Sequence, residues 1–247
     1  MFRYSGSKHR LLKHLPIPPL GTSTIIEPFA GSLAYSTAYR ASTIWAAEAN
    51  PQVHRLLSWI RSAATEADLD KVESCKPTEK VDARKWAEQH GLNDAQTTLM
   101  RLQISGAYVG QLSSWVLYPQ HQLKLQNLRK VLYDVKRALQ PVGHDFRDPR
   151  FADASRHHLA MAFVDPPYLG TAGNYKSPGE DHGVIDPGHI TSFIMNLQCP
   201  VLFTYGDGAA ETFPDFVWQK AVTRKVPILR GGGTRERTEY YALVNWR

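Results

Sequence analysis

A short apolar run that ends in a rigid, polar turn constrains the fold more than any other part of this sequence. Residues 159–164 are all apolar, and Asp165-Pro166-Pro167-Tyr168 follows directly. An unbroken apolar run of this length is typical of a strand that is buried on both faces of a parallel sheet. Proline has no N–H group and a fixed φ, so the two prolines end strand pairing and stiffen the turn. Open α/β sheets bind ligands at the carboxyl ends of such strands, which makes this turn a candidate site.

The residues of this turn suit methyl transfer to the exocyclic amine of a flat base. The lone pair of such an amine is conjugated with the ring, which makes the nitrogen a poor nucleophile. The Asp165 carboxylate and the Pro166 carbonyl would accept both amino hydrogens and draw the nitrogen toward tetrahedral geometry. Tyr168 would stack on a base that has swung out of its duplex. A tight turn with a buried tyrosine gives the same four residues, so the rest of the chain has to decide.

Two further strand ends predict a nucleotide-binding unit. Residues 24–26 are expected to form a strand that leads through a glycine-bearing turn into a helix at about 33–39. The glycine lets the backbone approach a ligand closely. Residues 44–47 form the next predicted strand, and the acid at its end stands near the spacing of about 20 residues at which a ribose is held. An asparagine then caps a helix that has proline in its first turn. The candidate residues are Glu27, Pro28, Phe29, Ala30, Gly31, Ser32, Glu48, Ala49 and Asn50.

Residues 62–143 change in character and predict a mostly helical insertion. Asn93 or Asp94 can cap one helix, and apolar residues at alternating spacings of three and four over 125–139 predict a second, amphipathic one. The opposite face of that second helix is basic, with Lys124, Arg129, Lys130, Lys136 and Arg137. This face either contacts DNA or is a solvated surface.

After the insertion the sheet is expected to resume. Asp153 precedes the 159–164 strand and is expected near the cofactor end, with Asp145 as a competing candidate. Residues 201–205 form another predicted strand, and 216–221 and 240–244 form an antiparallel pair. Between that pair lies a basic, glycine-rich stretch, which we interpret as a flexible loop that contacts phosphates. The DNA-binding candidates here are Thr234, Arg235 and Arg237, together with Asn174 and Tyr175 on another glycine-rich loop that would close over a substrate.

The composition fits these interpretations. The formal charge of +6 is compatible with nucleic acid, and much of it lies near the two ends of the sequence. Two distant cysteines argue against a zinc site and for a reducing compartment. No apolar run reaches the length of a membrane span. We therefore expect a cytoplasmic protein with no metal and no membrane contact, either a monomer or a weak dimer.

Taken in order, the motifs resemble those of the DNA adenine methyltransferases of the Dam type, in which cofactor motifs come first, a recognition insertion second and Asp-Pro-Pro-Tyr last. The resemblance spans nearly the whole chain. It is carried by Arg3-Tyr4-Ser5-Gly6-Ser7-Lys8, Ile26-Glu27-Pro28-Phe29-Ala30-Gly31-Ser32, Ala47-Glu48-Ala49-Asn50, Ala152-Asp153, Asp165-Pro166-Pro167-Tyr168, and Gly232-Gly233-Thr234-Arg235 followed by Glu239-Tyr240-Tyr241-Ala242-Leu243.

The resemblance implies a Rossmann-like, S-adenosylmethionine-dependent methyltransferase fold. Residues 1–61 and 144–247 would form the catalytic domain, and 62–143 an inserted target-recognition domain. The first motif adds Tyr4, Ser5, Gly6 and Lys8 to the cofactor-binding residues, and Glu48 would hold the ribose. Asp153 would contact the cofactor's adenine, and Asp165 would lie against both cofactor and target. The catalytic residues would be Asp165, Pro166, Pro167 and Tyr168.

The chain departs from the family pattern at three places. Leu33 stands where a second glycine is common and is expected to narrow the turn, Ser5-Gly6-Ser7 stands in place of a Gly-Gly pair, and Glu48 replaces an aspartate while keeping the carboxylate. The insertion does not match the family's recognition hairpin, so no target sequence carries over.

The expected function is methylation of adenine N6 in double-stranded DNA by S-adenosylmethionine. One alternative is methylation of cytosine N4, which more often has serine in place of Asp165. An alternative of another class is a catalytically idle DNA-binding protein that keeps the fold.

Overall fold

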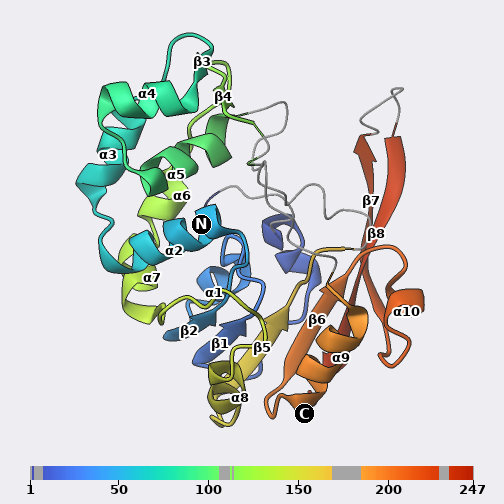
Figure 1. Ribbon diagram of the computed structural model, residues 1–247. Coiled ribbons are helices and arrows are strands. Elements are labelled where there is room, and N and C mark those ends of the chain that lie inside the picture. The colour runs from blue at the N-terminus through green and yellow to red at the C-terminus, as the bar shows by residue number, and fades with distance from the viewer. Residues whose placement is uncertain are drawn as a thin grey trace.

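Six strands form one central sheet in the computed structural model, which describes residues 2, 8–105, 112, 114–168, 185–227 and 234–246. In order across the sheet they are β2 (Thr43–Ala46), β1 (Thr24–Glu27), β5 (Ala160–Val164), β6 (Val201–Tyr205), β8 (Thr234–Val244) and β7 (Gln219–Pro227). The first four are parallel, and β8 runs antiparallel to both of its neighbours (Figure 1). The chain is therefore a mixed α/β protein with a mostly parallel sheet, compatible with a Rossmann-like fold.

The direction in which strands are added to the sheet reverses between β1 and β5. The chain passes from β1 to β2 on one side, and later returns to place β5 and then β6 on the other side of β1. In open α/β sheets, ligands bind outside the carboxyl ends of the strands at such a switch point. The predicted strands at 24–26, 44–47, 159–164 and 201–205 are confirmed to within one residue at each end.

Two short 3-10 helices, labelled η, and ten α-helices in the described ranges surround the sheet. They are η1 (Lys8–Arg10), η2 (Leu12–His14), α1 (Ala34–Ala38), α2 (Pro51–Ser62), α3 (Glu66–Ser74), α4 (Ala83–His90), α5 (Asp94–Ile104), α6 (Gln126–Arg129), α7 (Leu132–Ala138), α8 (Arg150–Ser155), α9 (Pro187–Asn196) and α10 (Ala209–Thr212). A two-stranded sheet pairs β3 (Val81–Asp82) with β4 (Val116–Leu117). No helix in the described ranges is both long enough and apolar enough to cross a membrane.

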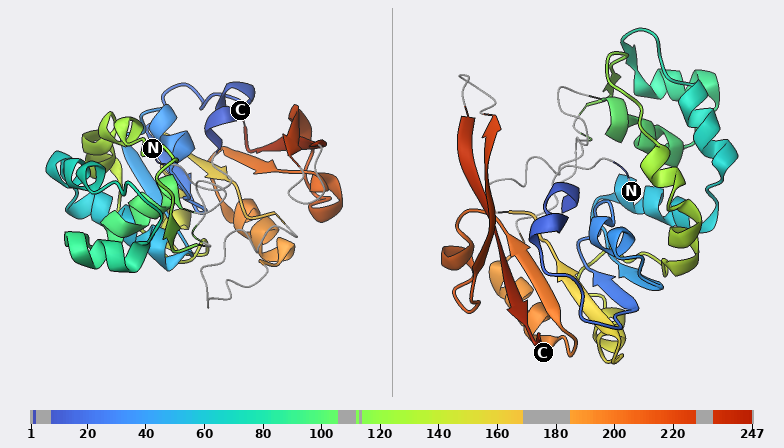
Figure 2. Two further views of the ribbon diagram at one scale, coloured as in Figure 1. Left: turned by 90° about the horizontal axis from the view of Figure 1, so that it is seen from above. Right: turned by 180° about the vertical axis from the view of Figure 1, so that it is seen from behind.

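Side chains at alternating positions of the central strands pack against layers on opposite faces of the sheet. Ile26 and Phe203 belong to a buried cluster that includes α8 and α9. Their neighbours Ile25 and Leu202 belong to a different cluster, with Tyr35 of α1 and the leucines around η2. Figure 2 shows the N-terminal turns on the face of the sheet away from α9. Covering on both faces explains why the central strands read as continuous apolar runs.

The region 62–143 packs as helices against α2 and the β2 edge of the sheet. A third buried cluster joins Ile44 of β2, Leu57 of α2, Leu99 of α5 and Leu132 of α7. The expected helical character is confirmed, and Asn93 caps α5 through a capping box with Gln96. The prediction of a single helix over 125–139 is wrong, because two separate helices, α6 and α7, are interrupted by a turn at residues 130–131. Five buried apolar positions at helical spacing serve two short helices as well as one long helix.

The last two strands extend further than expected. β7 and β8 pair from Gln219↔Tyr241 out to Pro227↔Thr234, and they project beyond the neighbouring strands on the side opposite the helical region (Figure 1). Residues 234–237 therefore belong to β8 rather than to a flexible loop, which corrects that expectation. The antiparallel pairing itself is confirmed.

Candidate active site

The carboxyl ends of β1 and β5 bring two acids together at the switch point. Glu27 ends β1, and Asp165 follows the last residue of β5. Glu27 is 2% exposed, and its Oε1 accepts the backbone N–H of Ser36 at 2.7 Å. Burial, with a smaller contribution from the nearby Asp165 charge, raises the pKa of Glu27 to about 7. Glu27 thus holds the first turn of α1.

The glycine turn after β1 is tied to the end of β2 by Glu48. Its Oε2 accepts the N–H of Gly31 and its Oε1 accepts the N–H of Asn50, both at 2.9 Å. Burial raises the pKa of this carboxyl to about 7. Asn50 in turn caps α2 by accepting the N–H groups of Gln52 and Val53. The glycine turn and the acid predicted to hold a cofactor therefore lie side by side, joined by a direct hydrogen bond.

The turn needs left-handed backbone at two positions. Gly31 has φ of 48° and Leu33, which precedes α1, has φ of 53°. Glycine adopts this conformation freely, whereas an L side chain is strained there by about 1–2 kcal/mol. The position of Leu33 is therefore one at which glycine is the easier residue. Leu33 is nevertheless fully buried and packs in the cluster formed with α2.

Asp165 is oriented from the neighbouring strand. The hydroxyl of Thr204, which is fully buried near the end of β6, donates to Oδ1 of Asp165 at 2.8 Å. Pro166 and Tyr168 beside it are buried, and Pro167 is half-buried. The carboxylate is thus fixed at the carboxyl end of β5 by a hydrogen bond that the sequence did not predict.

Tyr168 is held by a buried acid of β8. Its hydroxyl donates to Oε2 of Glu239 at 2.6 Å, and the two side chains are 9% and 1% exposed. Oε1 of Glu239 pairs with Arg224 at 2.9 Å and with Arg237 at 3.4 Å. The Arg237 guanidinium also lies 4.9 Å from the centre of the Tyr168 ring, within the range of a cation–π contact. The ring of Tyr205 also contacts the ring of Tyr168, with centroids 4.7 Å apart and the planes tilted by 55°.

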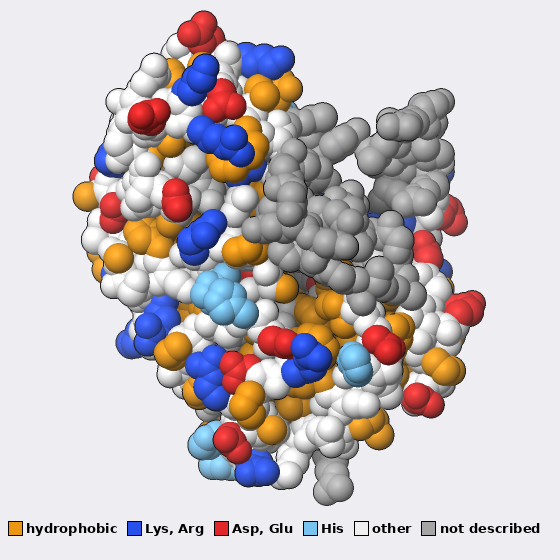
Figure 3. Space-filling view, viewed as in Figure 1, with side chains coloured by type: hydrophobic (Ala, Val, Ile, Leu, Met, Phe, Trp, Pro, Cys, Tyr) orange, Lys and Arg blue, Asp and Glu red, His pale blue; other side chains and the backbone are white. Residues whose placement is uncertain are grey.

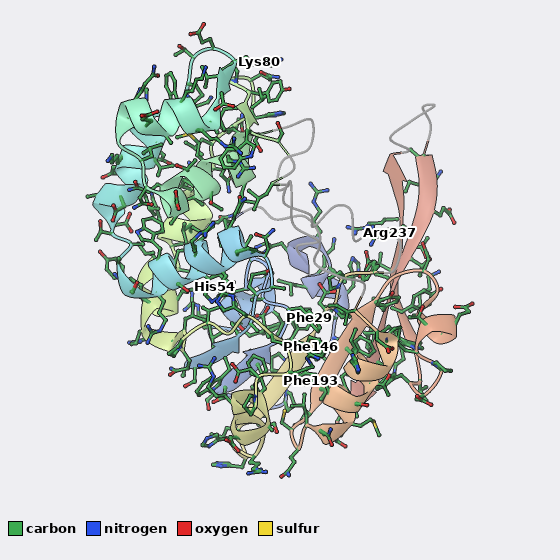
Figure 4. The ribbon with its side chains drawn as sticks, viewed as in Figure 1. Phe29, His54, Lys80, Phe146, Phe193 and Arg237 are labelled. Atoms are coloured by element: carbon green, nitrogen blue, oxygen red, sulfur yellow. The ribbon has the colours of Figure 1, made fainter. Side chains whose placement is uncertain are left out.

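An aromatic row runs from the glycine turn toward α9. The Phe29 and Phe146 rings stack with centroids 5.1 Å apart, and Phe193 meets Phe146 edge-on at 5.7 Å. Figure 4 shows the three one below another. Phe29 and Phe146 are both half-buried, so each keeps an accessible part that a flat ligand can reach.

This row distinguishes the two candidate aspartates. Asp145 adjoins Phe146, and the nearby Gly143 carbonyl accepts the N–H of Glu48 at 2.9 Å. The Arg147 guanidinium bonded to Asp145 keeps the pKa of that carboxyl below its usual value. Asp153 instead lies on α8, and the Asp153 side chain is 76% exposed and paired with Arg156. At the end of α8, the Ser155 hydroxyl accepts the N–H of Gln198, which shortly precedes β6. The helix α8 precedes β5 and lies toward the amino ends of the strands (Figure 1), so Asp153 is carried away from the carboxyl ends, where the cofactor was expected.

The DNA-binding candidates lie in different settings. Arg129 of α6 pairs with Glu66, Asp70 and Glu73 of α3 at 2.7–2.9 Å, which commits its guanidinium to packing within the helical region. Lys124 and Thr234 are exposed. Basic and acidic side chains are interspersed over the helical region on the face shown in Figure 3. Tyr4, Ser5, Gly6, Asn174, Tyr175 and the side chains of Lys8 and Arg235 lie outside the described part of the structure.

Three residues of the site carry no strong local signal. Thr204 and Glu239 matter because β8 pairs with β6 and β6 with β5, so only the strand order places them beside the Asp-Pro-Pro-Tyr turn. Phe146 follows Asp145, and the stacking on Phe29 is what gives it a place in the site. For Glu239, the hint in the sequence was its place at the start of the last motif of the family resemblance.

The described residues include no group of three or more His, Cys, Asp or Glu side chains arranged to hold a metal ion. In comparisons with known proteins, neither a protein-family model nor a curated protein matches this chain.

Proposed function

We propose that this chain is an S-adenosylmethionine-dependent methyltransferase that acts on the exocyclic amine of adenine in DNA. The observation that carries the proposal is the carboxylate of Asp165, fixed by Thr204 beside two prolines and Tyr168 at the switch point of the sheet. The glycine turn follows β1, which pairs with β5, and Glu48 accepts a hydrogen bond from that turn. The carboxyl ends of neighbouring strands therefore carry a hydrogen-bond acceptor, Asp165, an aromatic ring, Tyr168, and a turn of the kind that binds nucleotides.

The residues around the glycine turn fit an adenosine-containing cofactor. Gly31 has the backbone conformation that brings the chain close to a ligand. Glu48 offers a carboxylate for the ribose hydroxyls, and the half-buried rings of Phe29 and Phe146 offer apolar surface for the adenine. Asp145 stands beside these rings and is the acid that we assign to the adenine amino group, with Arg147 bonded to the same carboxylate. Such a cofactor supplies an electrophilic methyl group.

The catalytic residues act by positioning and electrostatics. The target amine donates its two hydrogens to the Asp165 carboxylate and the Pro166 carbonyl, so that its lone pair turns away from the ring. When the amine takes up the methyl group that the cofactor would supply, it would lose one N–H proton, which the Asp165 carboxylate would accept. Tyr168 contacts the plane of the extruded base. The Thr204 hydrogen bond fixes the Asp165 oxygens before the base arrives.

The test combines purified protein, methyl-labelled S-adenosylmethionine and DNA from a strain without DNA methylation, followed by nucleoside analysis. Label in N6-methyladenine supports the proposal. Label in N4-methylcytosine would replace adenine by cytosine as the target, and absence of label despite cofactor binding would favour an idle DNA-binding protein. The matched control is Asp165→Ala, which should abolish transfer and leave cofactor affinity within about threefold, because the acceptor pair serves the amine.

A further inference from the structure

A buried carboxylate stands just outside the carboxyl end of β6, next to the proposed methyl-transfer site. The last pair between β6 and β8 is Tyr205↔Tyr240, and Glu239 is the next residue of β8 beyond it. Its two oxygens have different partners. Oε2 accepts the Tyr168 hydroxyl at 2.6 Å, and Oε1 accepts a hydrogen bond from Arg224 and forms an ion pair with Arg237.

Stability alone does not explain a carboxylate at this position. Removing a carboxylate from water costs several kcal/mol, and a buried ion pair returns little net stability compared with apolar residues of similar volume. Most buried positions of the central strands are apolar, as in Val164, Phe203 and Ala242, and the buried carboxyl of Glu27 also lies beside the proposed site. Glu239, at 1% exposure, breaks this pattern where it meets Tyr168.

The hydrogen bond restricts the Tyr168 ring at its far end. The backbone end is already stiffened by Pro166 and Pro167. The neighbouring Gly206 leaves no spare room, since a Cβ there would lie 2.7 Å from a ring carbon of Tyr168. Burial raises the pKa of the Tyr168 phenol well above its usual value, so the hydroxyl keeps the proton that it donates. The ring therefore has one favoured orientation, set by Glu239.

We propose that Glu239 is a positioning residue for base binding: it holds the Tyr168 ring at the tilt that a flipped purine requires, while Arg224 and Arg237 balance its charge. This inference rests on the proposed function. It assigns Arg237 to the support of Tyr168, in addition to any contact with DNA phosphates.

The test is a cycle of four proteins: wild type, Tyr168→Phe, Glu239→Gln and the double variant. The readouts are kcat, KM for DNA, cofactor affinity and Tm. Each single variant should lower kcat about tenfold, within the about 100-fold that a misplaced group can cost, and should leave cofactor affinity unchanged. The double variant should be no slower than the slower single variant, because both changes remove the same constraint.

Tyr241→Phe is the matched control. It also removes a tyrosine hydroxyl from β8, but this hydroxyl donates to Gln219 at 2.7 Å and lies outside the site. It should keep wild-type kcat. If the effects of Tyr168→Phe and Glu239→Gln on kcat multiply, the two residues act independently and the inference is wrong. If Glu239→Gln does not fold, the comparison of Tyr168→Phe with Tyr241→Phe still decides, because equal kcat values would overturn the inference. A wild-type protein that transfers no methyl group would instead overturn the proposed function before any variant is compared.

Discussion

The Thr204 hydroxyl and the Asp165 carboxylate join the ends of two neighbouring strands by a hydrogen bond of 2.8 Å. The bond reaches across the β5–β6 ladder to the first residue after β5. Since Thr204 is fully buried, water cannot replace its hydroxyl as the partner of that oxygen without a local rearrangement. The orientation of the proposed catalytic carboxylate thus depends on a residue of another strand.

Thr204→Val should lower kcat about tenfold and change cofactor affinity little, because valine keeps the shape of the side chain and removes the donor. Thr204→Ser, which keeps the hydroxyl, should recover most of the rate. Steady-state kinetics with labelled cofactor and a DNA substrate measure both effects. Thr223→Val, which removes a threonine pair between β7 and β8 at 3.0 Å, is the control for a general loss of stability. Equal kcat for the Thr204 and Thr223 variants would refute the orienting role.

Local signals predicted those parts of the site that depend on neighbouring residues in sequence. The strand that leads into Asp165 and the cap at Asn50 each follow from a short pattern, and the structure contains both. The hydrogen bond between Gly31 and Glu48 joins two short patterns that were each recognised separately. Thr204 and Glu239 depend on the order of strands in the sheet, which no short pattern encodes.

Two other differences have physical causes of their own. The apolar spacing over 125–139 predicts which side of the segment is buried, but it does not predict whether the helix is continuous or is interrupted between α6 and α7. The charged residues 234–237 resemble a loop in sequence, yet they lie in a two-stranded projection of β7 and β8. A strand pair that projects from the sheet does not show the apolar alternation of a half-buried strand.

The pH dependence of stability should reveal the buried carboxyl of Glu27. Its pKa in the folded protein is about 7, against an ordinary 4.5. Between these values the folded chain holds a proton that the unfolded chain releases, so the free energy of unfolding should fall as the pH rises through this window. Glu27→Gln keeps an oxygen for the Ser36 N–H and should flatten the fall by on the order of 1–3 kcal/mol. Urea unfolding at several pH values measures the slope.

The pKa of Glu48 is raised in the same direction, so the free energy of unfolding of the Glu27→Gln variant should still fall somewhat as the pH rises. The exposed Glu88 of α4 supplies the control, and Glu88→Gln should follow the wild-type curve. A Glu27→Gln curve parallel to that of the wild type would show that this carboxyl is already ionised in the folded protein.

Leu33 combines an unfavourable backbone conformation with a favourable buried side chain. Leu33→Gly should relieve about 1–2 kcal/mol of left-handed strain but lose about 3–5 kcal/mol of core packing. The variant should therefore be less stable than the wild type, by about 2 kcal/mol. Leu33→Ala loses a similar side chain and keeps the strain, so it should be less stable than Leu33→Gly by about 1 kcal/mol. Denaturant unfolding of the three proteins gives this order, and a Leu33→Ala variant more stable than Leu33→Gly would contradict the left-handed conformation.

The three ion pairs of Arg129 should make it a residue of stability rather than of DNA contact. Its side chain is 22% exposed and joins α6 to three carboxylates of α3. Arg129→Gln leaves these carboxylates facing one another and should lower the free energy of unfolding by about 1 kcal/mol. Arg137 is the matched control, because its side chain is 85% exposed and its pair with Asp134 spans 3.8 Å. Arg137→Gln should stay within about 0.5 kcal/mol of the wild type.

The salt dependence of DNA binding separates the two roles of the basic residues in the insertion. A lysine or arginine that contacts a phosphate releases counterions, and its removal lowers the slope of log K against log salt by about 1. Lys124, which is exposed, should show this loss on conversion to glutamine if the insertion faces DNA. Arg129→Gln, measured where the protein remains folded, should keep the wild-type slope because its guanidinium is already paired with α3. A slope reduced by Arg129→Gln as much as by Lys124→Gln would place this guanidinium on the DNA backbone and would require its α3 pairs to open on binding.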